Sequence, residues 1–175
     1  MARLRQHRLT ILVAGGILAA VLVSSAVGDL SGGTGGAVTR VKVVSGSDLT
    51  SQRDNVFGNV PGAATFISVP SSGGLLTARF TALSACTSDS GGVCALRIRA
   101  SRGSTSRPME PAGDNNFDAA PTGAAAASAH LEAHAIERSL KVGGGVWKVF
   151  VQYAVTGQET VFFLDEWHLT VERSQ

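Results

Sequence analysis

The alternation of apolar and polar positions is most regular in residues 145–173, which hold both tryptophans and the only tyrosine. In the first half of this segment an apolar side chain recurs at every second position, the period of a β-strand with one buried face. These positions are Trp147, Val149, Val151, Tyr153 and Val155. A second apolar run, residues 161–171, follows a short loop that contains Gly157. The two runs predict an antiparallel hairpin near the centre of a sheet.

The second run changes face halfway along the expected strand. Phe162 and Leu164 share one face, and the apolar residues that follow share the opposite one. The residues on the opposite face are Trp167, Leu169 and Val171. A β-bulge inserts one residue and so reverses the parity of the positions after it. We therefore expect a bulge at Asp165-Glu166, which would bring all five apolar side chains into one core.

Four further strands are indicated upstream by β-branched runs or by alternation. They are residues 38–45, 65–69, 75–86 and 94–100. Pro70 should stop the second of these strands, and the NVPG sequence at 59–62 is typical of a turn. Alternation is cleanest in residues 94–100, where Arg97 and Arg99 should face solvent.

The middle of the chain is less regular. Residues 101–127 contain three prolines and an alanine run, and so long a stretch is a functional loop, a cover over a sheet edge, or disordered. Residues 128–142 have the Ala, Leu and Glu content of a helix, but their polar and apolar positions alternate from His130 to Arg138. We favour a strand, because Gly143-Gly144-Gly145 then makes a tight return into the next one.

Seven or eight strands with turns at short intervals predict an all-β fold, an antiparallel β-sandwich or jelly roll spanning residues 38–175. The segments LLTARFTALSAC, VCALRIRA, AHAIERSL and VFFLDEWHLTVERS resemble those of small exported jelly-roll proteins of unassigned function. This resemblance implies an eight-stranded sandwich and a strand at 130–140, and it implies no known activity.

The N-terminus predicts export. Arg3, Arg5 and Arg8 precede residues 9–28, a run of twenty residues without a charge, which as a helix would be about 30 Å long and could cross a bilayer. The basic flank should remain in the cytoplasm, so the rest of the chain would lie outside. Residues 1–28 are a signal peptide cut after Ala26, or an uncut anchor that holds the domain to the membrane. Residues 29–37 then form a Gly-rich tether.

Charge and cysteine content narrow the class of protein. Beyond the three leader arginines the chain carries 12 basic and 13 acidic residues, so it has no net charge that would favour nucleic acid. The only cysteines, Cys86 and Cys94, flank the sequence TSDSGGV, and in an exported protein such a pair predicts a disulfide. We expect this disulfide to close one hairpin and set its register.

Two weak motifs could hold a metal ion, and neither has the spacing of a known metal motif. Imidazole and carboxylate groups on two expected strands are possible zinc ligands; they are His130, Glu132, His134 and His168, with Glu166 beside the last. Oxygen ligands at alternate positions of a loop are similar to the first half of an EF-hand; they are Asp114, Asn116 and Asp118. The glycine and the glutamate that an EF-hand requires are replaced by Ala119 and Ala125. Both groups are also ordinary polar residues of a half-exposed strand and a loop.

No catalytic constellation emerges from the sequence. Residues 88–92, SDSGG, are similar to the GDSGG box of chymotrypsin-like proteases, but the only histidine before Ser90 is His7, in the leader. We therefore expect an exported non-catalytic β-sandwich that needs no cofactor and binds or assembles at the cell surface. The alternative is a metal-binding module or metal-dependent enzyme that uses His130, His134 and His168. Expected partners are a second copy, a cell-surface molecule, or the membrane through residues 9–28, and not nucleic acid.

Overall fold

The computed structural model describes residues 36–113, 115–121 and 130–175, which contain strands and no helix. Two antiparallel sheets of five strands each are present, so the prediction of an all-β sandwich is confirmed. Within the described ranges no helix is long and apolar enough to span a membrane. The predicted N-terminal helix and most of the tether lie outside the described residues.

The first sheet, sheet A, has the strand order β1-β10-β4-β8, and a short strand, β2, also pairs with β10. Its strands are β1 (Val38–Gly46), β2 (Thr50–Gln52), β4 (Gly74–Thr87), β8 (Glu132–Val142) and β10 (Val161–Ser174). The strand predicted within residues 128–142 is therefore confirmed as β8. The predicted bulge in β10 is also confirmed, because the register with β4 shifts between Asp165 and His168 and Glu166 has a positive φ of 44°.

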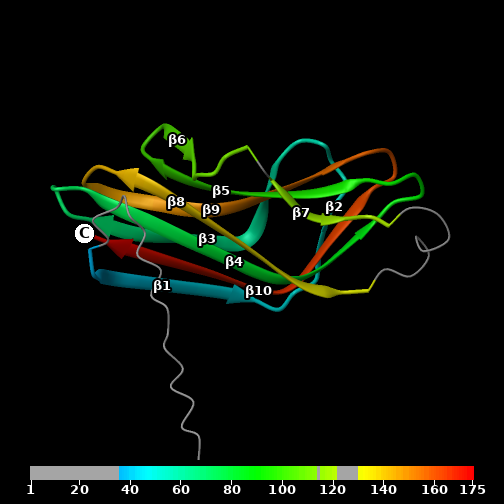
Figure 1. Ribbon diagram of the computed structural model, residues 1–175, viewed down its shortest axis with the longest axis horizontal. Coiled ribbons are helices and arrows are strands. Elements are labelled where there is room, and N and C mark those ends of the chain that lie inside the picture. The colour runs from blue at the N-terminus through cyan, green and yellow to red at the C-terminus, as the bar shows by residue number, and fades with distance from the viewer. Residues whose placement is uncertain (1–35, 114, 122–129) are drawn as a thin grey trace, which may run out of the picture. The chain divides into compact units, whose positions relative to one another are not determined.

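The second sheet, sheet B, has the order β3-β9-β5-β6, and β7 also pairs with β5 (Figure 1). Its strands are β3 (Gly58–Val69), β5 (Val93–Arg102), β6 (Thr105–Pro108), β7 (Asn116–Ala119) and β9 (Gly145–Thr156). The predicted turn at 59–62 is wrong. These residues lie inside β3, where the register with β9 shifts between Asn59 and Ala64. Gly62, with a φ of 73°, lets the extra residues bulge without ending the strand.

The core fills the space between the two sheets. Both tryptophans are buried, Trp147 at 6% and Trp167 at 4% exposure, as the alternation in β9 and β10 predicts. The largest fully buried side chains come from both sheets and from the segment after β6. They include Phe80, Leu76, Leu169 and Phe162 of sheet A, Ile67, Leu96, Ile98 and Val151 of sheet B, and Met109.

Consecutive long strands lie in opposite sheets. β9 belongs to sheet B and β10 to sheet A, so the predicted central hairpin is wrong. The link through Gly157 carries the chain from one sheet to the other, and the link through Gly143-Gly144 does the same between β8 and β9. A hairpin and such a crossing give the same alternation, because in both cases each strand turns one apolar face toward the core.

The disulfide between Cys86 and Cys94 is present, with 5.8 Å between the two Cα atoms. Its predicted role within a hairpin is wrong, because Cys86 ends β4 in sheet A and Cys94 begins β5 in sheet B. The bond therefore joins the two sheets where the chain crosses between them.

The proline-containing segment after β5 covers a sheet edge, one of the three roles expected for it. β6 and β7 both pair with β5. Between them, the amide of Met109 donates to Ile98 O (3.0 Å) in sheet B. Glu110 exchanges two backbone hydrogen bonds, of 2.7 and 2.8 Å, with Ser139 of β8 in sheet A. This segment thus connects the edges of the two sheets on one side of the sandwich.

Candidate functional site

The structure brings together one residue from each predicted metal-binding group. His134 of β8 and Asp118 of β7 meet at Ser84 of β4. The Ser84 hydroxyl donates to Asp118 Oδ2 (2.8 Å) and lies 2.8 Å from His134 Nδ1, while Nδ1 and Oδ2 are 3.9 Å apart. The three side chains form a polar cluster that links sheet A to sheet B.

The hydrogen-bonding roles in this cluster follow from the number of protons available. A carboxylate only accepts, and a serine hydroxyl has one proton to donate. Because Ser84 gives that proton to Asp118, His134 Nδ1 must be the protonated ring nitrogen and donates to Ser84 Oγ. In a hydrolytic triad the histidine lies between serine and aspartate; here the serine lies between them and is fully buried. The arrangement orients His134 and satisfies a buried hydroxyl.

A depression of about 300 Å³ on the outer side of β4 and β8 is lined mainly by Thr81, Leu83, Ala133, Ala135 and Glu166, and neither Ser84 nor Asp118 is among its lining residues. The ring of His134 also packs against Phe117, with 5.6 Å between ring centroids. Contacts with Ser84, Asp118 and Phe117 therefore fix the orientation of the His134 ring on the inner side of sheet A.

The other predicted ligands are not brought to the same place. His168 lies between the inward residues Trp167 and Leu169 of β10 and points outward, whereas His134 pairs with the inward Ala82. The two histidines thus point to opposite faces of sheet A, with β4 between their strands. Glu132 is exposed at the start of β8, and His130 is exposed two residues before it. Asp114 lies outside the described residues, and Asn116 is exposed on β7. Among the described residues no group of three potential ligands converges.

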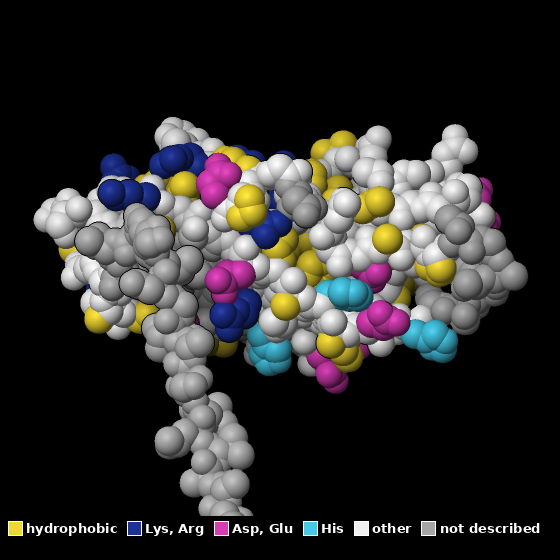
Figure 2. Space-filling model, viewed as in Figure 1, with side chains coloured by type: hydrophobic (Ala, Val, Ile, Leu, Met, Phe, Trp, Pro, Cys, Tyr) yellow, Lys and Arg dark blue, Asp and Glu magenta, His cyan; other side chains and the backbone are white. Residues whose placement is uncertain are grey.

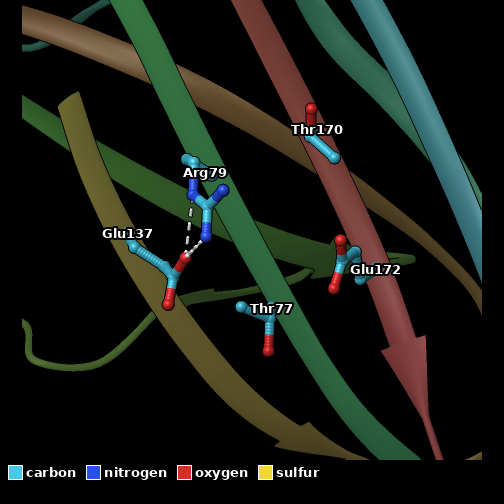
Figure 3. A pocket seen from close by; sticks show the side chains of 5 residues that line it. All are labelled: Thr77, Arg79, Glu137, Thr170 and Glu172. Carbon is cyan, nitrogen blue, oxygen red and sulfur yellow. Dashed lines mark hydrogen bonds and ion pairs between the residues drawn. The ribbon is translucent and has the colours of Figure 1, made fainter. Parts of the chain in front are cut away.

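A second, much smaller pocket of about 20 Å³ lies on the outer face of sheet A (Figure 3). Arg79 and Glu137 form an ion pair across it, with 2.6 Å between Nη2 and Oε2. The hydrogen bond and charge of Glu137 raise the pKa of Arg79. Both side chains are largely exposed, at 64% and 51%, so the pair is a surface interaction of small energetic effect.

Charge is distributed unequally between the sheets. The four described strands β3, β5, β6 and β9 contain no Asp or Glu, and their five basic residues are Arg97, Arg99, Arg102, Arg107 and Lys148. Sheet A carries Glu132, Glu137, Asp165, Glu166 and Glu172. In the view of Figure 2, Lys and Arg side chains gather mainly on the left, near β5 and β6, and the histidines lie along the lower edge beside acidic side chains.

The outer surface of sheet B combines these cations with aromatic rings. We call Phe66, Arg97, Arg99, Lys148 and Phe150 the basic face. All five side chains lie on the outer side of sheet B. Residues paired across neighbouring strands share a side, and Phe66 pairs with Lys148, and Phe150 with Arg99. Phe66 is 62% exposed, and the Lys148 ammonium lies 5.4 Å from the Phe150 ring centroid.

Arg97 is held in place at one end of this face. Its guanidinium lies 3.9 Å from the centroid of the Phe57 ring, and its Nε donates to Gln152 Oε1 (2.9 Å). Gln152 in turn donates to Asn59 Oδ1 (2.9 Å). Partial burial, and secondarily the charge of Arg99, lower the pKa of Arg97. This guanidinium therefore lies in an environment that lacks a compensating negative charge.

The basic face was not among the candidate sites predicted from the sequence. Total charge conceals it, because basic and acidic residues nearly balance over the chain. The available signal was the absence of acidic residues from the segments that became β3, β5 and β9, and this signal has meaning only once those segments share a sheet.

Comparison with known proteins assigns no family. No family model matches the chain, and no match is found among curated proteins. Among solved structures, dimeric latent PorU from Porphyromonas gingivalis is similar at 12% identity and a TM-score of 0.35, over 81% of this chain and 14% of that one. TmCBM61 in complex with beta-1,4-galactotriose is similar at 15% identity and a TM-score of 0.31. The similarity covers 77% of this chain and 90% of that one. A structure of infectious bursal disease virus, Gx strain, is similar at 12% identity and a TM-score of 0.26. The similarity covers 78% of this chain and 41% of that one. At these TM-scores the similarities assign no function to this chain.

Proposed function

We propose that this chain is an exported, non-catalytic β-sandwich domain that binds or assembles at the cell surface. The apolar leader with its basic flank supports export. The disulfide between Cys86 and Cys94 supports an oxidising compartment outside the cytoplasm.

The observation that carries the binding proposal is the basic face. In the part of the chain that the structure describes, no ion pair involves Arg97, Arg99 or Lys148. Each of the three lies on a regular strand of the scaffold. Charged and aromatic side chains that share one rigid face favour recognition of a partner with complementary charge.

We also propose that the sandwich is a jelly roll. The strand orders β1-β10-β4-β8 and β3-β9-β5-β6, with links that alternate between the sheets, support this connectivity.

A retention experiment tests the binding proposal. The full-length chain, in detergent micelles, is passed over immobilised neutral polysaccharides, acidic polysaccharides and the chain itself. We expect retention on at least one surface, and loss of retention in the triple variant Arg97→Gln, Arg99→Gln, Lys148→Gln. The matched control replaces three basic residues of sheet A: Arg40→Gln, Lys42→Gln, Lys141→Gln. Equal retention of the two triple variants would contradict the assignment of binding to the basic face. If the parent chain were retained on none of the surfaces, the binding function would be contradicted.

A further inference from the structure

We propose that the basic face binds a linear acidic polysaccharide, with carboxylates contacting Arg97, Arg99 and Lys148 and a sugar ring packing on Phe66. This inference rests on the proposed binding function and names its ligand class. Three features of the basic face support it: the spacing of its cations, its exposed aromatic ring, and its mixed hydrogen-bonding groups.

The cations are spaced for a polymer with repeated charges. Arg97 and Arg99 lie two residues apart on one face of β5, which places them roughly 7 Å apart. Lys148 lies on the adjacent strand β9 and pairs with Ser101, two positions beyond Arg99, so it is a diagonal neighbour of Arg99 at about 7–8 Å. An arginine fork suits the planar carboxylate group. A row of charges along the outer face of a sheet matches an extended chain better than a single small anion.

Phe66 supplies an apolar platform beside these cations. It is 62% exposed, and Val146, 57% exposed, lies on the neighbouring strand. Lys148 pairs directly with Phe66, so one sugar unit could contact the ring while its carboxylate meets the ammonium. An exposed aromatic residue among cations marks an interaction surface more strongly than an isolated apolar residue does.

The polar groups around the arginines both donate and accept hydrogen bonds. Asn59, Gln152 and Arg97 form a continuous ladder across β3, β9 and β5, and Arg99 Nε donates to the Ser106 hydroxyl (3.0 Å). Sugar hydroxyls need both kinds of partner, whereas nucleic-acid phosphates only accept. The near-neutral body of the chain also lacks the overall positive charge on which nucleic-acid binding depends. These points favour a carboxylated sugar polymer over a nucleic acid.

The experiment measures affinity of the full-length chain, in detergent micelles, for polygalacturonate. Methyl-esterified polygalacturonate has the same backbone without the charge, and single-stranded oligothymidylate has charge and rings without sugar carboxylates. We expect binding to polygalacturonate that is at least about tenfold tighter than to either comparison polymer.

Two variants and their controls locate the site. Phe66→Ala and Arg99→Gln should each weaken polygalacturonate binding by about tenfold. Val43→Ala, at a residue 60% exposed on β1, and Lys141→Gln on β8 should leave it unchanged. Unchanged binding by Phe66→Ala and Arg99→Gln would overturn the inference.

The polymers separate failure of this inference from failure of the proposed function. Equal binding to the esterified polymer would overturn the requirement for charge and leave a carbohydrate-binding domain. Tighter binding to oligothymidylate would replace the sugar polymer with a nucleic acid. Binding to none of the three would overturn the ligand class, and retention on the chain itself or on another surface would still support the binding function.

Discussion

Ser84 is one of the residues at which polar contacts join the two sheets. It is fully buried, and its hydroxyl contacts a carboxylate from sheet B and an imidazole from sheet A. This hydroxyl both donates and accepts a hydrogen bond. Its removal would leave the two partner side chains without a hydrogen-bond partner, and this cost is its main contribution to stability.

Replacement of Ser84 by alanine should therefore destabilise the fold. We expect Ser84→Ala to lower the free energy of unfolding by about 1–3 kcal/mol, because Asp118 and His134 lose their shared partner. Urea denaturation followed by tryptophan fluorescence measures the change. The control is Thr81→Ala on the outer side of the same strand, expected within about 0.5 kcal/mol of the parent chain. Equal stability of the two variants would show that the cluster has no structural effect.

At the residue scale, the sequence predicted which side chains are buried better than it predicted which side chains contact one another. Both tryptophans, Phe162 and Leu164 are buried as their parity indicates. The positions of His134 and His168 on two expected strands predict a shared metal site, but the contacts of His134 are Ser84 and Asp118. Burial follows from alternation along one strand, whereas contacts between β4, β7 and β8 depend on segments far apart in the chain.

At the scale of elements, the links between strands define the architecture. β4 to β5, β8 to β9 and β9 to β10 each cross from one sheet to the other. The disulfide lies at the first of these crossings. It therefore stabilises the approach of the two sheets, and not the register of one hairpin.

Removal of the disulfide should have a measurable effect on stability. We expect the double variant Cys86→Ala, Cys94→Ala to lose about 2–3 kcal/mol of unfolding free energy, since the bond closes a short loop in the unfolded chain. Thermal and urea unfolding of the oxidised parent and the variant measure the loss.

Reductant provides the control for this prediction. Dithiothreitol should destabilise the parent chain by a similar amount and leave the double variant unchanged. A parent chain whose unfolding midpoint does not respond to reductant would contradict the stabilising role of the bond.

At the scale of the whole molecule, two sheets of different charge share one core. Arg97, Arg99 and Lys148 of sheet B face away from that core, and the carboxylates of the strands, apart from Asp118 of β7, belong to sheet A. The two outer faces thus offer different surfaces to partners, and the proposed binding face is the one without carboxylates.

Export of the domain remains a prediction, and a reporter fusion tests it. A reporter enzyme that is active only outside the cytoplasm, fused after Gln175, should be active when attached to the full-length chain. The same fusion without residues 1–28 should be inactive. Activity of the shortened fusion, or inactivity of the full-length one, would contradict export through the leader.

By itself, the sequence did not determine the short strands β2, β6 and β7, but it determined the seven long strands, the buried face of those that alternate clearly, the bulge in β10 and the pairing of the two cysteines. Each of these depends on parity along a single strand or on the only available partner. The tertiary structure alone decided which strands are neighbours, that the expected hairpins are crossings, that NVPG lies within β3, and that cations collect on sheet B. The physical reason is that an apolar face is buried equally well beside a strand of its own sheet or opposite one of the other sheet, so the local pattern is the same in both.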